Sequence, residues 1–456
     1  MYFEQITTPG LGCFSYAIGC PMAGVMAVVD PRRDIGVYLR ISEEQGMRIT
    51  HIFDTHIHAD HISGTQQLRD ATSADIHIHE SAPVGYAAKK LKHGDEFTFG
   101  SAIIRVLHTP GHTPNSVSFL VADLARSPKP AMILTGDLLF VGDIGRPDLP
   151  GAAILDGQIE NLHNSLYTVL GQLPDGLEVY PAHGQGSLCG QGMSAKPSTT
   201  LGYERLANPM LRHPDFTAFR QAVLSHLPMR PQSFSAIIAA NMTGDIPILP
   251  TCEPAGQALS VAETDVLLRG GALLLDLRDR FAYGTAHIPG SINVDASSSA
   301  MLNWIGVAVP PGRPLVLILP AAKRFEEMRL ELQRIGYDTL KGWLKGGMSA
   351  WLDSGRDAQT LPYVSASRLR TRLAEENPPL LIDVRSPKEF EKMRIEDSLH
   401  LPFDRLLEQS PLPEMLEKES VVICQSGFRA SIAASLLQAQ GCAHVSVLAS
   451  GLNAWQ

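Results

Sequence analysis

A short histidine-rich segment constrains this chain more than any other feature. Residues 55–61 read Thr-His-Ile-His-Ala-Asp-His, which places three histidines and one aspartate within six residues. Further candidate ligands follow later in the chain, at His112, Asp137 and His183. Imidazole nitrogen and carboxylate oxygen are ligands that suit zinc, iron or manganese. We therefore expect a metal site that is assembled from several separate loops.

The candidate ligands follow short apolar runs. Residues 49–53 precede the histidine segment, residues 103–107 precede His112, and residues 131–134 precede Asp137. Short apolar runs of this kind predict buried strands. Loops at the strand ends of a sheet-based fold gather in one pocket, so we expect one site. Its candidate residues are His56, His58, Asp60, His61, His112, Asp137 and His183.

Composition narrows the class of function. The chain has 456 residues, 44% of them hydrophobic, and a formal net charge of −9. This length allows several domains, and the acidic balance without a long basic run disfavours nucleic-acid binding. We find neither a secretory signal nor an apolar run long enough to span a bilayer, so no membrane partner is expected. The six cysteines are scattered without paired spacing, which favours a reducing, cytoplasmic compartment.

The second half of the chain contains an internal repeat. Residues 274–278 (Leu-Leu-Asp-Leu-Arg) are echoed by residues 381–385 (Leu-Ile-Asp-Val-Arg), and residues 346–351 by residues 450–455. Each copy alternates short strands with helices, which predicts a small α/β domain around a parallel sheet. The expected organisation is an α/β multidomain chain with a metal domain at 1–245, a linker at 246–259, and repeats at 260–355 and 362–456.

A cysteine loop in the second repeat has the character of an anion site. A β-branched strand at residues 421–423 leads into Cys424, and a helix is expected from about residue 430. The backbone N–H groups of such a loop and the helix dipole stabilise a thiolate and bind an anion. We expect catalytic roles for Cys424 and Arg429, around a loop of Gln425, Ser426, Gly427 and Phe428. The alternative is a buried structural thiol, the commonest fate of a free cysteine.

Residues 1–245 resemble the metallo-β-lactamase superfamily through the histidine segment, His112, Asp137 and His183. The resemblance implies an αββα sandwich with the metal at one edge. Residues 136–149 and 181–190 are similar to the persulfide dioxygenases of that superfamily. This branch implies one Fe(II) per chain, held by His56, His112 and Asp137. It implies ligand-orienting roles for His58, Asp60, His61 and His183.

Other metal chemistries stay open at this point. Every residue for a dinuclear zinc site is also present, and such a site would hydrolyse a thioester, as glyoxalase II does. A third possibility is a sulfur carrier in which Cys424 passes sulfur to a partner and the metal is structural. The resemblance gives Arg146 a contact with the substrate, with a surface salt bridge as an equal alternative. Cys20 and Cys189 have no assigned role.

The Cys424 loop, with residues 383–385 and 451–455, resembles rhodanese sulfurtransferases. The resemblance implies that Cys424 carries a persulfide. In the first repeat, aligning Arg324 with Arg429 places Leu319 where Cys424 stands. Because leucine cannot carry sulfur, residues 260–355 are predicted to be an inactive, structural rhodanese-like domain.

Together the resemblances imply a persulfide dioxygenase–rhodanese fusion that acts in sulfide detoxification. Its small molecules would be a thiol persulfide, dioxygen, and sulfite or thiosulfate, and a homo-oligomer is expected. The identity of the thiol is open among glutathione, coenzyme A, bacillithiol and cysteine. The direction of the sulfur-transfer step is open as well.

Overall fold

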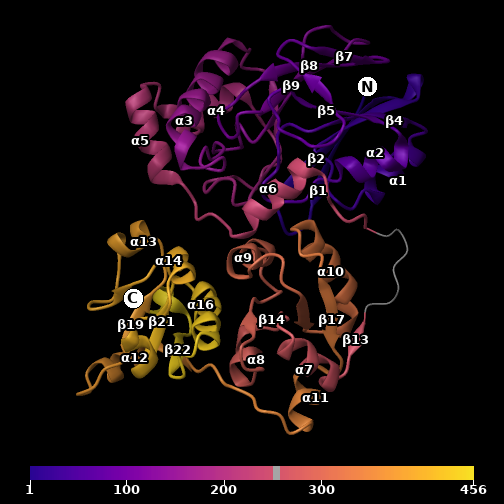
Figure 1. Ribbon diagram of the computed structural model, residues 1–456. Helices are drawn as coiled ribbons and strands as arrows, with labels where there is room; N and C mark the ends of the chain where they lie inside the picture. Colours follow the sequence, from indigo (N-terminus) through magenta and orange to yellow (C-terminus); the bar gives the residue numbers. More distant parts are fainter. Residues whose placement is uncertain (250–256, 456) are drawn as a thin grey trace. The chain divides into compact units, whose positions relative to one another are not determined.

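The computed structural model describes residues 1–249 and 257–455 (Figure 1). The chain divides into two compact units, Met1–Thr251 with Gln333–Gly336, and Cys252–Leu332 with Tyr337–Gln456. Residues 250–256 of the predicted linker lie outside the described residues. Among the described residues, no helix combines the length and apolar character needed to cross a membrane.

The first unit is built on two six-stranded sheets. One sheet has the order β1 (Tyr2–Thr8), β2 (Cys13–Cys20), β3 (Val25–Val29), β4 (Arg48–Phe53), β5 (Asp75–His79) and β6 (Lys89–Leu91). The other has the order β12 (Thr199–Thr200), β11 (Glu178–Pro181), β10 (Met132–Gly136), β9 (Val117–Asp123), β8 (Ala102–His108) and β7 (Glu96–Phe99).

The two sheets face each other across an apolar core. In β9, Val117, Phe119 and Val121 belong to this inner core, whereas Leu120 belongs to the core on the opposite face. Because successive strand residues point to opposite faces, a strand buried on both faces is apolar throughout. This accounts for the continuous apolar runs that predicted the strands.

Helices cover the outer face of each sheet. On one side α1 (Gly36–Glu44) and α2 (Thr65–Thr72) bury Tyr38, Ile41 and Leu68 against the first sheet. On the other side α3 (Leu155–Asn164) and α5 (Phe216–His226) pack on the second sheet. The unit also contains α4 (Leu201–Ala207) and α6 (Ser233–Thr243). The arrangement confirms the predicted αββα sandwich.

The second unit holds two five-stranded parallel sheets of the same design. The first has the order β13 (Ala258–Leu259), β17 (Leu340–Leu344), β16 (Leu315–Ile318), β14 (Leu273–Asp276) and β15 (Ile292–Asn293). The second has the order β18 (Tyr363–Val364), β22 (Val445–Leu448), β21 (Ser420–Ile423), β19 (Leu380–Asp383) and β20 (Leu399–His400). The shared order confirms the internal repeat as two copies of one α/β domain.

Short helices flank both sheets. The first domain has α7 (Val261–Arg269), α8 (Arg280–Thr285), α9 (Met301–Ala308), α10 (Phe325–Arg334) and α11 (Gly347–Asp353). The second has α12 (Ala366–Leu373), α13 (Pro387–Lys392), α14 (Phe403–Glu408), α15 (Pro413–Glu417) and α16 (Phe428–Ala439).

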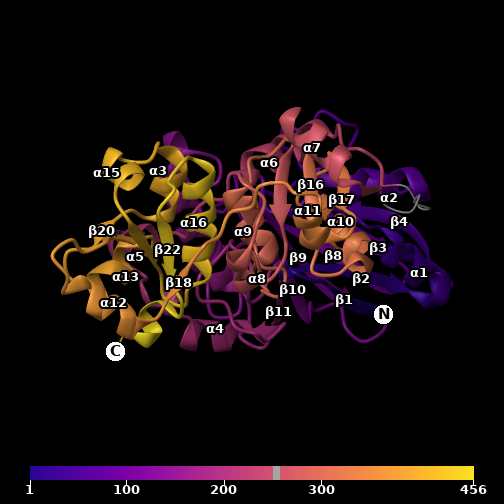
Figure 2. The same ribbon diagram turned by 90° about the horizontal axis from the view of Figure 1, so that it is seen from below.

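Helix α16 joins the two domains of this unit. It packs on β21 and β22 of its own domain and on β15 of the preceding one. Figure 2 shows α16 beside β22. Residues Ala430 to Leu437 are all buried, and the backbone N–H of Asn293 in β15 donates to Ser435 Oγ at 3.2 Å. A helix that is covered on all sides needs small or apolar residues all round, which its alanine-rich sequence supplies.

Candidate metal centre and sulfur-transfer loop

Three ligand atoms converge at the ends of strands of the first unit. His56 follows β4, His112 follows β8, and Asp137 follows β10. One donor atom from each residue lies within 4.8 Å of the other two, and all three residues are buried. Nε2 of His112 lies 3.4 Å from Asp137 Oδ2, and Nε2 of His56 lies 3.9 Å from the same oxygen.

These converging atoms lack hydrogen-bond partners. Nε2 of His56, Nε2 of His112 and Oδ2 of Asp137 are all buried and unpartnered among the described residues. One such unpaired buried atom destabilises a fold by about 1–3 kcal/mol. Three of them at one point indicate that a cation belongs there. Two imidazoles and one carboxylate with open positions fit a divalent transition metal such as Fe(II).

A backbone carbonyl fixes the orientation of His112. Its Nδ1 lies 2.8 Å from the carbonyl oxygen of Arg146. Because a carbonyl can only accept, Nδ1 carries the proton and Nε2 keeps its lone pair for the metal. The preceding residue, Gly145, packs against the Asp137 backbone, where a Cβ would lie 1.8 Å from the Asp137 carbonyl oxygen. Glycine at this position therefore allows the chain to pass close to Asp137 before it reaches Arg146.

A hydroxyl and a carboxylate fix the orientation of His56. The Thr55 hydroxyl donates to Asp30 Oδ2 at 2.8 Å, and Thr55 Oγ1 lies 2.9 Å from His56 Nδ1. Since the hydroxyl proton points to Asp30, Thr55 Oγ1 accepts from His56 Nδ1–H. Nε2 of His56 therefore also keeps its lone pair free.

A second group of donor atoms lies beside the first, and its members form hydrogen bonds with one another. Donor atoms of Cys13, Asp60, His61 and His183 lie within 4.8 Å of each other. His183 joins the groups through Nδ1 to Asp137 Oδ1 at 2.6 Å and Nε2 to Asp60 Oδ2 at 2.7 Å. The Cys13 thiol donates to Asp60 Oδ2 at 3.1 Å, and Asp60 Oδ1 lies 3.1 Å from His61 Nδ1.

Charge within this network shifts the ionisation of its members. Burial opposes the charged form of His183, but the carboxylates of Asp137 and Asp60 raise the pKa of His183 well above its usual value. Burial likewise opposes the charged form of Asp137, yet the imidazoles of His183 and His112 hold its pKa below the ordinary range. The His183 ring thus bridges the two carboxylates through both of its nitrogens.

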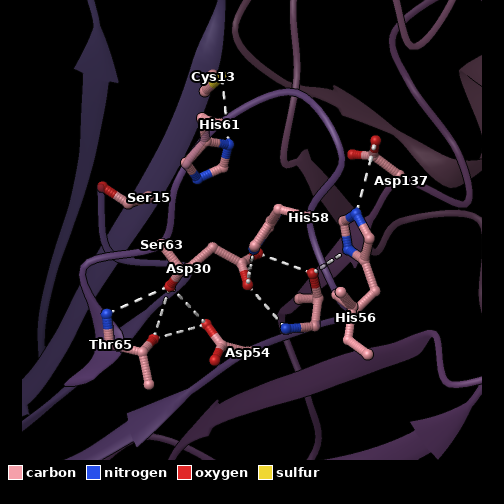
Figure 3. Close-up of polar contacts among 12 residues, drawn as sticks. Cys13, Ser15, Asp30, Asp54, His56, His58, His61, Ser63, Thr65 and Asp137 are labelled. Carbon is pink, nitrogen blue, oxygen red and sulfur yellow. Dashed lines mark hydrogen bonds and ion pairs between the residues drawn. The ribbon is translucent and has the colours of Figure 1, made fainter. Parts of the chain in front are cut away.

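His58 belongs to a third group. Its Nε2 lies 3.2 Å from Asp30 Oδ1, and its close donor group comprises Asp30 and Asp54 rather than His56 and His112 (Figure 3). Asp54 Oδ1 accepts from the Thr65 hydroxyl at 2.8 Å. Sequence reasoning missed Asp30 and Asp54, although each directly follows a strand, the signal used for the other candidates.

The side chain of Arg146 forms an ion pair and hydrogen bonds within the fold. It is buried and forms a two-pronged ion pair with Asp148, with both N–O distances at 2.7 Å. It also donates to the carbonyls of Leu188, Pro228 and Met229. These contacts argue against the substrate contact expected from the sequence and for an internal ion pair. The contribution of Arg146 to the site is its carbonyl on His112.

Cys189 lies beside the metal centre, in a donor group with Asp137 and His183. It is fully buried, and this burial raises the pKa of the thiol to about 12. Cys20, outside this region, accepts a weak hydrogen bond from the Ser101 hydroxyl at 3.5 Å.

The Cys424 loop forms a cradle of backbone N–H groups around the sulfur. Cys424 follows β21, and its Sγ accepts from the N–H groups of Gly427 at 3.1 Å and Ala430 at 3.3 Å. Gly427 has φ of +88°, and a Cβ there would lie 2.5 Å from the Ala449 carbonyl oxygen. The loop therefore requires glycine at this position.

The remaining loop residues are held from outside the loop. Arg429 pairs with both carboxylate oxygens of Glu389, at 2.8 and 2.6 Å, and the Gln425 amide donates to Asn453 Oδ1 at 2.6 Å. Burial opposes ionisation of Glu389, but the pairing with Arg429 lowers its pKa to about 2. Sequence reasoning missed Glu389, whose only local signal is its capping box with Ser386.

The equivalent loop of the first domain lacks this cradle. Leu319 follows β16 and is buried, and a short 3-10 turn, Ala322–Arg324, takes the place of the glycine-containing bend. Arg324 pairs with Glu327. The structure provides neither a sulfur atom nor a left-handed residue in this loop.

Comparison with known proteins agrees with this geometry. The metallo-β-lactamase superfamily model matches residues 27–183, and the rhodanese-like domain model matches residues 260–354 and 365–456. A crystal structure of a metallo-β-lactamase from Staphylococcus aureus subsp. aureus COL is 31% identical with a TM-score of 0.67, covering 75% of this chain and 98% of that one. This chain belongs to the metallo-β-lactamase superfamily. It carries two rhodanese-like domains after the superfamily domain.

Two curated relatives bear on the chemistry. The mitochondrial persulfide dioxygenase ETHE1 of Bos taurus is 27% identical over 253 residues, which are 54% of this chain and 90% of the relative. A hydroxyacylglutathione hydrolase of Methylococcus capsulatus is 32% identical over 179 residues, which are 37% of this chain and 61% of the relative.

Proposed function

We propose that the first unit is a persulfide dioxygenase with one Fe(II) held by His56, His112 and Asp137. The balanced reaction is RSSH + O₂ + H₂O → RSH + SO₃²⁻ + 2 H⁺. The observation that carries the proposal is the convergence of three unpartnered buried atoms, one from each of these residues. Similarity to persulfide dioxygenases over more than half of the chain supports it.

The chain's own residues would prepare this centre. Bound there, Fe(II) would supply the one-electron chemistry that dioxygen needs to react with a closed-shell sulfur compound. The Arg146 carbonyl and the Thr55 hydroxyl keep the Nε2 atoms of both histidines unprotonated toward it. His183 holds Asp137 through Oδ1 and so leaves Oδ2 for the metal.

We propose that Cys424 carries sulfur between a persulfide and sulfite. The thiolate attacks the outer sulfur of a second persulfide, Cys–S⁻ + RSSH → Cys–S–S⁻ + RSH. Sulfite then attacks that outer sulfur, Cys–S–S⁻ + SO₃²⁻ → Cys–S⁻ + S₂O₃²⁻. The N–H groups of Gly427 and Ala430 stabilise the negative sulfur in both directions. Joining both reactions in one chain keeps sulfite near its acceptor, which suits sulfide detoxification.

The experiment combines metal analysis with oxygen uptake. Protein of known iron and zinc content is given glutathione persulfide or coenzyme A persulfide in an oxygen electrode, and sulfite and thiosulfate are quantified. We expect about one iron per chain, and persulfide-dependent oxygen uptake. A Cys424→Ser variant should keep the oxygen uptake but release sulfite in place of thiosulfate. Iron-loaded protein that consumes no oxygen with either persulfide would contradict the proposal.

A second candidate function is thioester hydrolysis at two zinc ions. The close grouping of Cys13, Asp60, His61 and His183, and the similarity to hydroxyacylglutathione hydrolases, favour it. We rank it second because the donors of this group already bind one another. Two zinc ions per chain and hydrolysis of S-lactoylglutathione without oxygen uptake would reverse the ranking.

A further inference from the structure

The first rhodanese-like domain has no sulfur carrier, but it places a charged side chain at the loop of the second. We propose that Arg280 of this non-catalytic domain makes the Cys424 site selective for anionic sulfur compounds such as thiosulfate. The inference rests on the proposed sulfur transfer at Cys424 and adds the residue that selects its anionic co-substrate.

Arg280 contacts the backbone of the sulfur loop directly. It is the first residue of α8, and its Nη1 donates to the carbonyl oxygen of Ser426 at 3.3 Å. Ser426 lies midway between Cys424 and Arg429. The guanidinium therefore lies at the loop that surrounds the sulfur, although it comes from the preceding domain.

Hydrogen bonds from the second domain hold the Arg280 backbone in place. The Tyr363 hydroxyl lies 3.0 Å from the Arg280 carbonyl oxygen and 2.9 Å from Ser431 Oγ. The Ser431 hydroxyl in turn donates to the Gly427 carbonyl oxygen at 2.8 Å. The two hydroxyl protons serve two of these three contacts at a time, and the contacts together place the Arg280 backbone beside the turn that cradles Cys424.

Among the described residues, two arginines of this site are held in ion pairs, whereas Arg280 is not. Arg429 is paired with Glu389, and Arg385 is paired with Asp383. Arg280 forms no ion pair with the described residues, and its neighbour Asp279 accepts from the N–H groups of Phe281 and Ala282 at the start of α8. The charge of Arg280 therefore adds to the attraction of this loop for an approaching anion.

Aromatic side chains of both domains surround the same region. The Trp304 ring of the first domain lies 4.8 Å from the Phe403 ring and 6.3 Å from the Phe428 ring, edge to face in both cases. Phe281 of the first domain lies 4.8 Å from Tyr363. Phe281 is 47% exposed and the Arg280–Ser426 contact is exposed, so Arg280 acts on an anion from the solvent-accessible side of this loop.

The transfer step that this charge assists is balanced. The Cys424 thiolate attacks the outer sulfur of thiosulfate, the S–S bond of thiosulfate breaks, and sulfite leaves with the electron pair. Cys–S⁻ + S₂O₃²⁻ gives Cys–S–S⁻ + SO₃²⁻, with three negative charges on each side. Thiosulfate or sulfite carries two of these charges, so a nearby cation favours its binding in either direction.

The test compares a charged and a neutral reagent at the same sulfur. Cys424 of the full chain is alkylated with iodoacetate or iodoacetamide, and the rate at Cys424 is followed by peptide mass spectrometry. Because both reagents need the same thiolate, the ratio of their rates reports the local charge. We expect Arg280→Ala to lower the iodoacetate-to-iodoacetamide ratio by about fivefold and Arg280→Lys to restore most of it. The matched control is Arg313→Ala in the same domain, whose guanidinium donates to the Gly271 carbonyl.

A kinetic comparison then connects the charge to turnover. Thiosulfate is compared with the singly charged donor benzenethiosulfonate, with cyanide as acceptor. Arg280→Ala should raise the KM for thiosulfate about fivefold or more, with a smaller change for the singly charged donor and little change in kcat. An unchanged alkylation ratio, or no alkylation of wild-type Cys424, would overturn the role of Arg280. A lowered ratio in a protein that transfers no sulfur would instead overturn the proposed function while preserving the anion site.

Discussion

The carbonyl oxygen of Arg146 accepts a hydrogen bond from His112 Nδ1 at 2.8 Å. A residue whose side chain is committed to an ion pair thus decides through its backbone which nitrogen of His112 faces the metal centre. Such contacts hold a ligand in its productive tautomer before the metal arrives.

Removing His112 should empty the metal centre without unfolding the domain. We expect His112→Ala to lower metal affinity at least about a hundredfold, because one of three ligands is lost and the others stay. Inductively coupled plasma mass spectrometry of the purified variant measures this loss. The control is His108→Ala, four residues earlier, where the ring contacts the Pro114 carbonyl and stacks on His79 but offers no atom to the metal centre. Full iron occupancy in His112→Ala would remove His112 from the ligand set.

Gly427→Ala should abolish the sulfur site. The new Cβ would lie 2.5 Å from the Ala449 carbonyl oxygen, so the loop must shift and the N–H groups leave Cys424. Gly441→Ala is a matched control, because Gly441 also has a positive φ, +99°, but has no heavy atom within 4 Å of the added carbon. We expect at least a tenfold loss of sulfur transfer for Gly427→Ala beyond that of the control. Equal activities in a cyanide-acceptor assay would argue against the cradle.

His77 should make the first unit sensitive to acid. Its buried ring packs against Phe53 and Phe97, whose ring centroids are each 4.8 Å away, and neither ring nitrogen has a hydrogen-bond partner among the residues that the structure describes. Burial lowers its pKa to about 4, so the unfolded chain binds a proton below about pH 6.5 while the folded state does not. The resulting loss of stability begins near that pH and continues down to the folded-state pKa.

His77→Phe should remove this sensitivity while keeping the aromatic packing. Between about pH 7 and pH 5 we expect the variant to lose about 2 kcal/mol less stability than the wild type. Thermal melting at both pH values measures the difference, and the exposed His93→Phe is the control. A wild-type melting temperature that falls no more than that of His77→Phe on acidification would show that His77 is not the responsible group.

Leu319→Cys should not create a second sulfur carrier. The loop after Leu319 continues into a 3-10 turn without a left-handed residue, so no converging N–H groups would stabilise a thiolate there. In a Cys424→Ser background we expect the variant to show no persulfide at residue 319 by mass spectrometry and no sulfur transfer. Restored transfer would mean that the cysteine alone, without the cradle, suffices.

Local sequence patterns predicted much of the fold and much of the candidate site. His56, His112 and Asp137 each follow a buried strand, and that short-range order is legible in the sequence. The partners that orient them are not local. Asp30 contacts Thr55 from the end of the neighbouring strand β3, and the Arg146 carbonyl contacts His112 from a different loop. Such pairings depend on how strands and loops pack, which no single segment encodes.

The same limit applies to the rhodanese-like half. The Cys424 loop was predicted from its own residues, but Glu389 and Arg280 approach it from other helices. A repeat reveals which residues are shared between copies, such as Asp276 and Asp383. It does not reveal which residues of one copy contact the loop of the other.

Both rhodanese-like domains contain the same aspartate–arginine contact. Arg278 binds Asp276 and the Ala286 carbonyl, and Arg385 binds Asp383 and the Met393 carbonyl in the same way. Since only the second of these domains has a cysteine in its loop, and the first has Leu319 there, the aspartate–arginine contact belongs to the scaffold rather than to the cysteine site. A duplicated domain can thus lack the loop cysteine and still retain the ion pair that stabilises its fold. Its surface residues can then contact the neighbouring domain.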